Sequence, residues 1–349
     1  MKNFIGWGIR IRKDLSRNYY SVWENLKTTR LDLGEEIKLP YDRSEFYDVG
    51  ITERCNLACQ YCYVSADNTR QDYKNICETW KSWMASFPED KPVDLEGDEI
   101  FRDIIAKPEK TITQEELIFK YKVHWYLKNK FPVVYTEKMM QVAIGSVGSP
   151  TIHPDFPEFL QTVYETKVVP NYTTNGLILA SNTSQSEKIL EATRNFVGGV
   201  AVSYGNKTVR TQADKAIEKL LTKGDCKVMI HHLISDKASV DELLEAEDKW
   251  GKDIHYHVLL PLKRHGRSDK EMTEEAYLYL VEKIKEKNYD NLAFGMWFLP
   301  WMKKYPGSIN CWDYPGETYS SNLLLKDGKV LITPSSYNLE VVKEISMEK

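Results

Sequence analysis

The chain has 349 residues, of which 42% are hydrophobic and 12% aromatic, and its formal net charge is −4. This composition supports a packed core and excludes a disordered chain. The slightly acidic balance argues against nucleic-acid binding through a broadly basic surface. Six cysteines are too few and too unevenly placed for a secreted disulfide framework. No apolar run is long enough for a signal peptide or a membrane span, so we expect a cytoplasmic protein with one large domain or two.

Six short apolar runs, each ending in a polar or glycine-containing turn, are typical of buried parallel strands. They span Phe46–Thr52, Gln141–Gly145, Val168–Thr173, Gly199–Ser203, Lys227–His231 and His255–Leu260. Amphipathic stretches predict helices over Gln114–Lys128, Phe156–Thr166, Ser184–Asn195, Ala213–Lys223, Ser239–Trp250 and Glu274–Lys287. The alternation of strands and helices predicts an α/β fold around a parallel sheet over residues 46–290.

Three regions fall outside this repeat. Residues 1–45 form an N-terminal extension, and residues 65–139 form a long insert after the first strand. The aromatic and basic helix of the insert either packs onto the parallel-sheet domain or serves as a lid or substrate-recognition element. In a small C-terminal extension, residues 291–349, the pair Asp327-Gly328 between two apolar runs predicts a β-hairpin.

Three cysteines, Cys55, Cys59 and Cys62, lie within eight residues. A structural zinc site or a fully protein-ligated iron–sulfur cluster needs four ligands. A loop with three thiols therefore suits a [4Fe–4S] cluster that leaves one iron open to another ligand. The alternative is a zinc knuckle or an electron-carrier cluster that Cys77 completes.

The spacing Cys-x3-Cys-x2-Cys, with Tyr61 before the last cysteine, resembles the signature of the radical S-adenosylmethionine (radical SAM) superfamily. In parallel αβ barrels the active site lies at the carboxyl ends of the strands. There, the turns of this chain resemble the family's cofactor elements in the same order. These turns are Val147–Pro154, Thr173–Gly176, Ser203–Gly205, His231-His232 and Leu260–Arg267. The resemblance covers about residues 46–267 and implies a partial (β/α)6 barrel of the TIM type.

The resemblance implies that Cys55, Cys59 and Cys62 hold a [4Fe–4S] cluster and that S-adenosylmethionine (SAM) binds its open iron. It further implies a SAM site beside the cysteines and at the strand ends, formed by Tyr61, Tyr63, Ser146, Gly148, Ser149, Pro150, Thr174, Asn175, Ser203, His232, Leu260, Pro261 and Arg264. An electron donor such as flavodoxin or ferredoxin drives reductive cleavage of SAM in such enzymes. The resulting 5′-deoxyadenosyl radical takes a hydrogen atom from the substrate.

For several other side chains the sequence allows either a functional or a structural role. Cys311 is a candidate hydrogen-atom donor, or else a small buried hydrophobic residue. His231 and His232 alternate along one strand, so one should face the barrel interior and the other the helices. Lys263, Arg264 and Arg267 bind the carboxylate of SAM or an anionic substrate, or else are solvated charges.

Two features depart from the family pattern. Ser149 stands where the family's Gly-Gly-Glu-Pro motif has an acidic residue, and a hydroxyl binds an ammonium group less strongly than a carboxylate does. The C-terminal hairpin resembles the start of a SPASM or twitch extension, but Cys311 is alone before it, and Ser335 and Ser336 follow it. We therefore expect a degenerate extension without an auxiliary cluster.

The SPASM-like hairpin favours a radical SAM enzyme that acts on a peptide or protein side chain. One alternative is a radical SAM enzyme that acts on a small molecule or nucleotide. Another, from a different class, is a non-catalytic iron–sulfur or zinc protein. In that case Cys77 would be a ligand, and its replacement would destroy the metal site.

Overall fold

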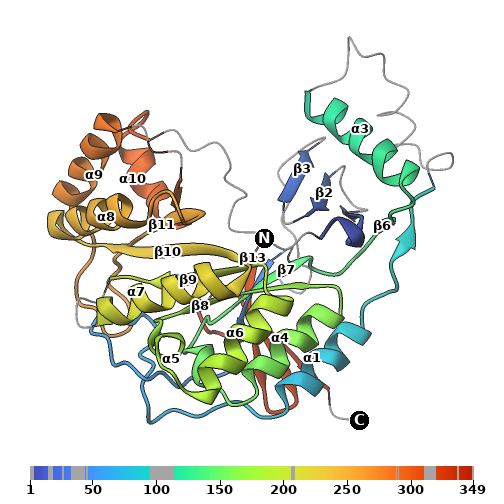
Figure 1. Cartoon of the computed structure of the whole chain (residues 1–349), viewed down its shortest axis with the longest axis horizontal. Coiled ribbons are helices and arrows are strands. Elements are labelled where there is room, and N and C mark those ends of the chain that lie inside the picture. Colours follow the sequence, from blue (N-terminus) through green and yellow to red (C-terminus); the bar gives the residue numbers. More distant parts are fainter. Residues whose placement is uncertain are drawn as a thin grey trace.

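Two β-sheets organise the chain. The computed structural model describes residues 4–14, 19–25, 27–32, 44, 46–94, 114–205, 209–287, 289, 291–309, 320–335 and 338–347. A ten-stranded sheet forms the body of the molecule, and a five-stranded sheet lies beside it in a smaller lobe (Figure 1).

The large sheet has the strand order β12-β11-β10-β9-β8-β7-β4-β13-β14-β15. Neighbouring strands run parallel from β12 to β13 and antiparallel from β13 to β15. Its strands are β4 (Phe46–Gly50), β7 (Gln141–Ile144), β8 (Val169–Thr174), β9 (Gly199–Ser203), β10 (Lys227–Ile234), β11 (Tyr256–Pro261), β12 (Leu292–Phe294), β13 (Ser320–Lys326), β14 (Lys329–Thr333) and β15 (Lys343–Ser346). The predicted α/β class is confirmed: the six expected strands are parallel neighbours in an open sheet, and β12 and β13 extend the parallel part at its two ends.

Alternating side chains give this sheet two different faces, as β10 illustrates. Val228 and Ile230 are buried in the hydrophobic core beneath the helices. Met229 and His231, which alternate with them, point to the concave face and line a cavity there. A strand repeats every two residues, so an apolar face toward the helices leaves the other face free to carry polar groups.

Helices cover the outer face of the sheet (Figure 1). Thr183, Asp236 and Thr273 each cap a helix N-terminus by accepting a hydrogen bond from a backbone N–H, which explains where three of the helices begin. The helices are α1 (Ile76–Ala85), α3 (Gln114–Lys128), α4 (Phe156–Glu165), α5 (Leu177–Ala180), α6 (Ser184–Phe196), α7 (Arg210–Lys219), α8 (Lys237–Trp250), α9 (Glu274–Glu286) and α10 (Leu299–Lys304).

The smaller lobe combines the beginning of the chain with the long insert. Its sheet has the order β3-β2-β1-β6-β5, in which β1 pairs parallel with β6. The strands are β1 (Ile9–Asp14), β2 (Tyr19–Glu24), β3 (Lys27–Asp32), β5 (Lys91–Pro92) and β6 (Val133–Tyr135). Phe119 and Val123 on α3 pack against Ile9 and Ile11 on β1. The insert therefore shares a hydrophobic core with residues that precede the parallel sheet.

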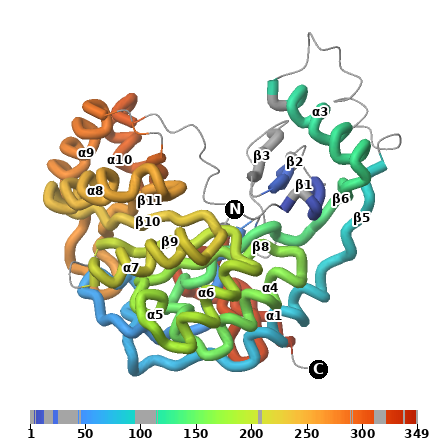
Figure 2. Tube along the Cα trace, viewed as in Figure 1, coloured from blue at the N-terminus to red at the C-terminus, as the bar shows by residue number. Residues whose placement is uncertain are grey.

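The C-terminal hairpin belongs to the large sheet. Strands β13 and β14 form it around Asp327-Gly328, and β13 pairs parallel with β4. Figure 2 shows this C-terminal segment, in red, in the part of the molecule that holds α1 and α4. Its relation to a SPASM extension stays a prediction, and Cys311 and Ser336 lie outside the described residues. Across those residues, every helix is too short or too polar to traverse a bilayer.

Candidate functional site

The three-cysteine loop leaves the carboxyl end of β4, where the thiols of Cys55, Cys59 and Cys62 are partly exposed and free of disulfides. The backbone N–H of Leu57 points at Cys55 Sγ from 3.4 Å, and that of Ala66 points at Cys62 Sγ from 3.4 Å. Burial raises the pKa of Cys55, and the N–H of Leu57 offsets part of this shift. Two backbone N–H groups of the loop are thus already directed at sulfur atoms.

Polar contacts fix the base of this loop. Asp72 accepts a hydrogen bond from Thr52 Oγ1 at 2.6 Å and pairs with Arg54 Nη1 at 2.5 Å. Glu53 accepts a hydrogen bond from Tyr73 at 2.8 Å, and Lys326 of the C-terminal hairpin approaches the same carboxylate oxygen to 3.5 Å. The hairpin thus helps to anchor the segment that carries the cysteines.

The turn after β7 packs directly on the cysteine loop. Tyr63 Oη donates to the carbonyl of Ser146 at 2.7 Å, and the backbone N–H of Ser149 donates to the carbonyl of Arg54 at 2.8 Å. The hydroxyl of Ser149 is buried 3.3 Å from Thr151 Oγ1. The structure therefore brings these SAM-site candidates together with the cysteines. Pro150, also buried, begins the 3-10 turn Pro150–Ile152.

Gly148 allows this close approach. A Cβ atom added to Gly148 would lie 2.4 Å from the carbonyl oxygen of Thr52 and 2.6 Å from that of Arg54. We expect Gly148→Ala to destabilise the fold by about 1–3 kcal/mol, because backbone cannot move aside as a flexible side chain can. Denaturant unfolding of the apoprotein measures the change. Gly6→Ala, whose added Cβ meets nothing within 4 Å, is the control, and equal midpoints for the two variants would contradict the steric argument.

The ends of β8 and β9 also reach this region. Asn175 donates to Asn56 Oδ1 at 2.7 Å and lies 3.9 Å from Cys55 Sγ, so it borders the cysteine loop directly. Thr174 is buried and accepts a hydrogen bond from the N–H of Gly176 at 3.1 Å, which shapes the turn. Ser203 ends β9 and is only partly buried.

The remaining candidates lie at the ends of β10 and β11. His232 is buried on the helix-facing side, where its Nε2 lies 2.8 Å from His257 Nδ1, and burial lowers its pKa. His231, not His232, therefore faces the cavity. Leu260 is partly exposed and Pro261 is buried. The side chain of Arg264 is 69% exposed and lies 3.9 Å from Glu271, so it points mainly into solvent.

Tyr61 lies beside the cysteines. Its hydroxyl hydrogen-bonds to Cys59, and burial, followed by the charge of Cys59, raises the pKa of Tyr61. Of the SAM-site candidates, Tyr61, Tyr63, Ser146, Gly148, Ser149 and Asn175 contact the cysteine loop or its flanks.

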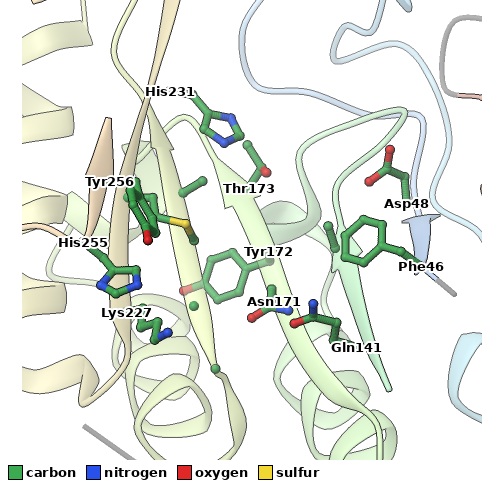
Figure 3. A pocket seen from close by; sticks show the side chains of 15 residues that line it. Phe46, Asp48, Gln141, Asn171, Tyr172, Thr173, Lys227, His231, His255 and Tyr256 are labelled. Atoms are coloured by element: carbon green, nitrogen blue, oxygen red, sulfur yellow. The ribbon is translucent and has the colours of Figure 1, made fainter. Parts of the chain in front are cut away.

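A cavity of about 410 Å³, lined by polar and apolar side chains, opens on the concave face of the large sheet (Figure 3). Asp48 lies on one side of it, and Lys227 and His255 lie on the other. Its lining comprises Phe46, Asp48, Gln141, Ala143, Asn171, Tyr172, Thr173, Gly198, Gly199, Ala201, Lys227, Met229, His231, His255 and Tyr256. Phe46, Gln141, Gly199, Lys227 and Tyr256 begin their strands, so most of the lining lies toward the amino ends of the strands. Thr173 and His231 lie further along β8 and β10.

Asp48 is the functional candidate that the sequence analysis missed. Burial raises its pKa to about 6, and within the described part of the chain its carboxylate has no hydrogen-bond or ion-pair partner. Burial also lowers the pKa of Lys227, and lowers that of His231 to about 4. Unpaired ionisable groups that line one cavity are typical of a binding site. An acidic residue inside an apolar strand was the available signal.

The fold matches that of SuiB from Streptococcus suis. Bound to S-adenosylmethionine, SuiB superposes with a TM-score of 0.55 at 14% identity, over 88% of this chain and 64% of SuiB. Bound to its precursor peptide SuiA, it gives a TM-score of 0.54 at 14% identity, over 88% of this chain and 63% of SuiB. Our chain thus spans less than two thirds of SuiB. It shares the fold of SuiB.

The predicted resemblance to the radical SAM superfamily is therefore confirmed at the level of the fold. No protein-family model matches the sequence, and neither does any curated protein. At 14% identity, only the arrangement of the chain is compared, so the site must be judged from its own residues.

The cysteine loop fits a cluster. Within the described residues, no three His, Cys, Asp or Glu side chains converge closely enough to hold a single metal ion. In a [4Fe–4S] cluster each thiolate binds a different iron, which requires a wider separation. Two backbone N–H groups already point at sulfur, and the buried hydroxyl of Ser146 keeps unused hydrogen-bonding capacity within the described structure.

Proposed function

We propose that this chain is a radical SAM enzyme whose substrate is a side chain of a peptide or protein. The observation that carries the proposal is the preformed loop of three free thiols at the carboxyl end of β4, within a fold shared with SuiB. SuiB binds S-adenosylmethionine and, in a separate structure, a precursor peptide. These likenesses support the proposed substrate class.

In this proposal Cys55, Cys59 and Cys62 hold the cluster as thiolates. Ser146 and Asn175 lie where they can contact SAM, because both border the cysteine loop. When bound, the reduced cluster and SAM supply a carbon-centred radical able to take a hydrogen atom from the substrate. The turn around Gly148 holds the loop in one geometry, and precise positioning is the protein's main contribution to such chemistry.

The cavity on the concave face is the proposed place of the substrate. Its volume of about 410 Å³ lies within the range of small-molecule sites. Asp48 offers a carboxylate to a cationic or hydrogen-bond-donating group, and Gln141 and Asn171 offer amides. These groups orient the substrate; the chemistry takes place at the cofactor.

Anaerobic reconstitution with iron and sulfide tests the proposal. With SAM and a strong reductant, the loaded protein should release 5′-deoxyadenosine and methionine. A library of unmodified peptides should contain members that accelerate this release and acquire a mass change. A cluster-loaded protein that leaves SAM intact under these conditions would count against the enzyme class.

A cavity of this size also favours a second candidate, a radical SAM enzyme that acts on a small molecule or nucleotide. The same assay separates the two. Stimulation of SAM cleavage by metabolite or nucleotide pools, with peptides inert, would favour this alternative.

A further inference from the structure

Arg267, in the loop after β11, hydrogen-bonds to the three-cysteine loop that follows β4. Its Nη1 donates to the carbonyl of Cys59 at 2.9 Å, and its Nη2 donates to the carbonyl of Ala66. Its backbone N–H donates to the carbonyl of Cys62 at 3.0 Å. Two of the three cysteines are thus held through their carbonyl groups by one residue.

This contact spans the large sheet. In the strand order, β10, β9, β8 and β7 lie between β11 and β4, so the two loops come from strands that are not neighbours. Arg267 therefore connects the loop after β11 to the loop after β4, across the concave side of the open sheet. Without such a link, a hinge motion of the sheet would move the cysteines relative to the strand ends that complete the site.

The neighbouring Gly266 makes the contact tight. Its φ is +63°, a left-handed conformation that glycine adopts without strain. A Cβ atom there would lie 2.4 Å from the carbonyl oxygens of both Cys62 and Tyr63. Even the smallest side chain at this position would force the two loops apart.

The guanidinium of Arg267 brings positive charge to the cysteine loop. Its hydrogen bonds to Cys59 and Ala66 are to neutral carbonyls, and the carboxylate of Asp67 lies 4.0 Å away. The side chain is only 25% exposed, so solvent screens its charge incompletely. Positive charge beside thiolates stabilises them, and it stabilises an added electron on any metal group that they hold.

We propose that Gly266 and Arg267 form a latch, positioning residues that hold Cys59 and Cys62 in place for the cluster, and that the guanidinium raises the reduction potential of the bound cluster. The proposal rests on the proposed function only in assuming that the thiols carry an iron–sulfur cluster. Arg267 acts through the cysteines and needs no contact with SAM or substrate.

Four variants separate the two roles of the latch. Gly266→Ala opens the contact but keeps the guanidinium, Arg267→Lys keeps the charge but loses the two-pronged hydrogen bonding, and Arg267→Gln loses the charge. Arg264→Ala, at an exposed position nearby, is the control. Each is reconstituted anaerobically, and its iron content, its rate of iron loss to a chelator and its midpoint potential are measured.

We expect Gly266→Ala, Arg267→Lys and Arg267→Gln to lose iron about tenfold faster than the wild type, the effect of one or two lost hydrogen bonds. Only Arg267→Gln should lower the midpoint potential, whereas Arg264→Ala should match the wild type in both. A merely structural role would leave the potential of Arg267→Gln unchanged and overturn the electrostatic half.

Wild-type iron retention in both Gly266→Ala and Arg267→Gln would overturn the latch while leaving the proposed function intact. If Arg267→Gln does not fold, the test uses Gly266→Ala and Arg267→Lys, whose folding is checked by the unfolding midpoints of the apoproteins. Wild-type iron retention in the folded variants would then overturn the latch. A wild-type chain that takes up no iron would overturn the proposed function and the latch together.

Discussion

Replacing Cys62 with alanine is expected to abolish cluster binding and to reduce 5′-deoxyadenosine formation at least about 100-fold. The cysteine loop supplies three thiolates and has no spare thiol, so two ligands cannot hold a four-iron cluster against loss to solvent. Iron and sulfide content after anaerobic reconstitution, together with the visible absorbance of the cluster, measures the first effect. Product quantification measures the second.

Cys77→Ala is the matched control for this experiment. Cys77 lies on α1 in the hydrophobic core, where burial raises its pKa to about 11 and its thiol hydrogen-bonds to Thr162 on α4. We expect this variant to keep its cluster and to lose about 1 kcal/mol of stability from a small cavity. Loss of the cluster in Cys77→Ala as well would support the four-thiolate alternative.

Asp48→Asn is expected to stabilise the apoprotein by up to about 3 kcal/mol at neutral pH. Burial raises the pKa of Asp48 from 3.8 to about 6, so the folded state binds this proton more tightly than the unfolded state does. A shift of about two units corresponds to about 3 kcal/mol of destabilisation once the group is ionised in both states. Asparagine removes the charge and keeps the shape.

The sign of this effect fixes its pH dependence. The destabilisation by Asp48 is absent below pH 3.8, grows as the pH rises toward 6 and is complete above 6, so the advantage of asparagine should shrink on acidification through this window. Thermal unfolding at pH 4.5 and pH 7.5 measures it. Asp269→Asn, at an exposed position, should change neither midpoint. An unchanged midpoint for Asp48→Asn at pH 7.5 would show that the carboxylate is not desolvated.

Local periodicity explains why the parallel sheet could be predicted. Each of its first six strands has an apolar face covered by helices, and the helix boundaries follow caps such as Thr183 and Thr273. The smaller lobe could not be predicted in this way. Its strand β1 pairs with β6, although β4 of the large sheet lies between them in the sequence. A pairing between such distant segments produces no local sequence pattern.

Some features of the candidate site could likewise be predicted from the sequence, and others could not. The order of the strand-end turns in the sequence indicated that the cysteine loop and the turn around Gly148 lie together. Alternation along β10 predicted that His231 and His232 face opposite sides of the sheet. Which of the two faces the helices depends on the side of the sheet that the helices cover. The sequence of one strand does not contain that information. The sequence indicated Arg267 only as a candidate for binding an anionic group, and its backbone-carbonyl partners in the cysteine loop are seen only in the folded structure.

The pairing of β13 with β4 has a consequence for how this protein is made. Ser320 pairs with Phe46 and Leu324 with Gly50, so the strand that carries the cysteines gains this neighbour from the far end of the chain. During synthesis, β4 and its loop leave the ribosome long before β13 does. Until then β4 would be an exposed edge, open to pairing with other chains. Delivery of iron and sulfide should therefore succeed best once β13 has been synthesised and has paired with β4.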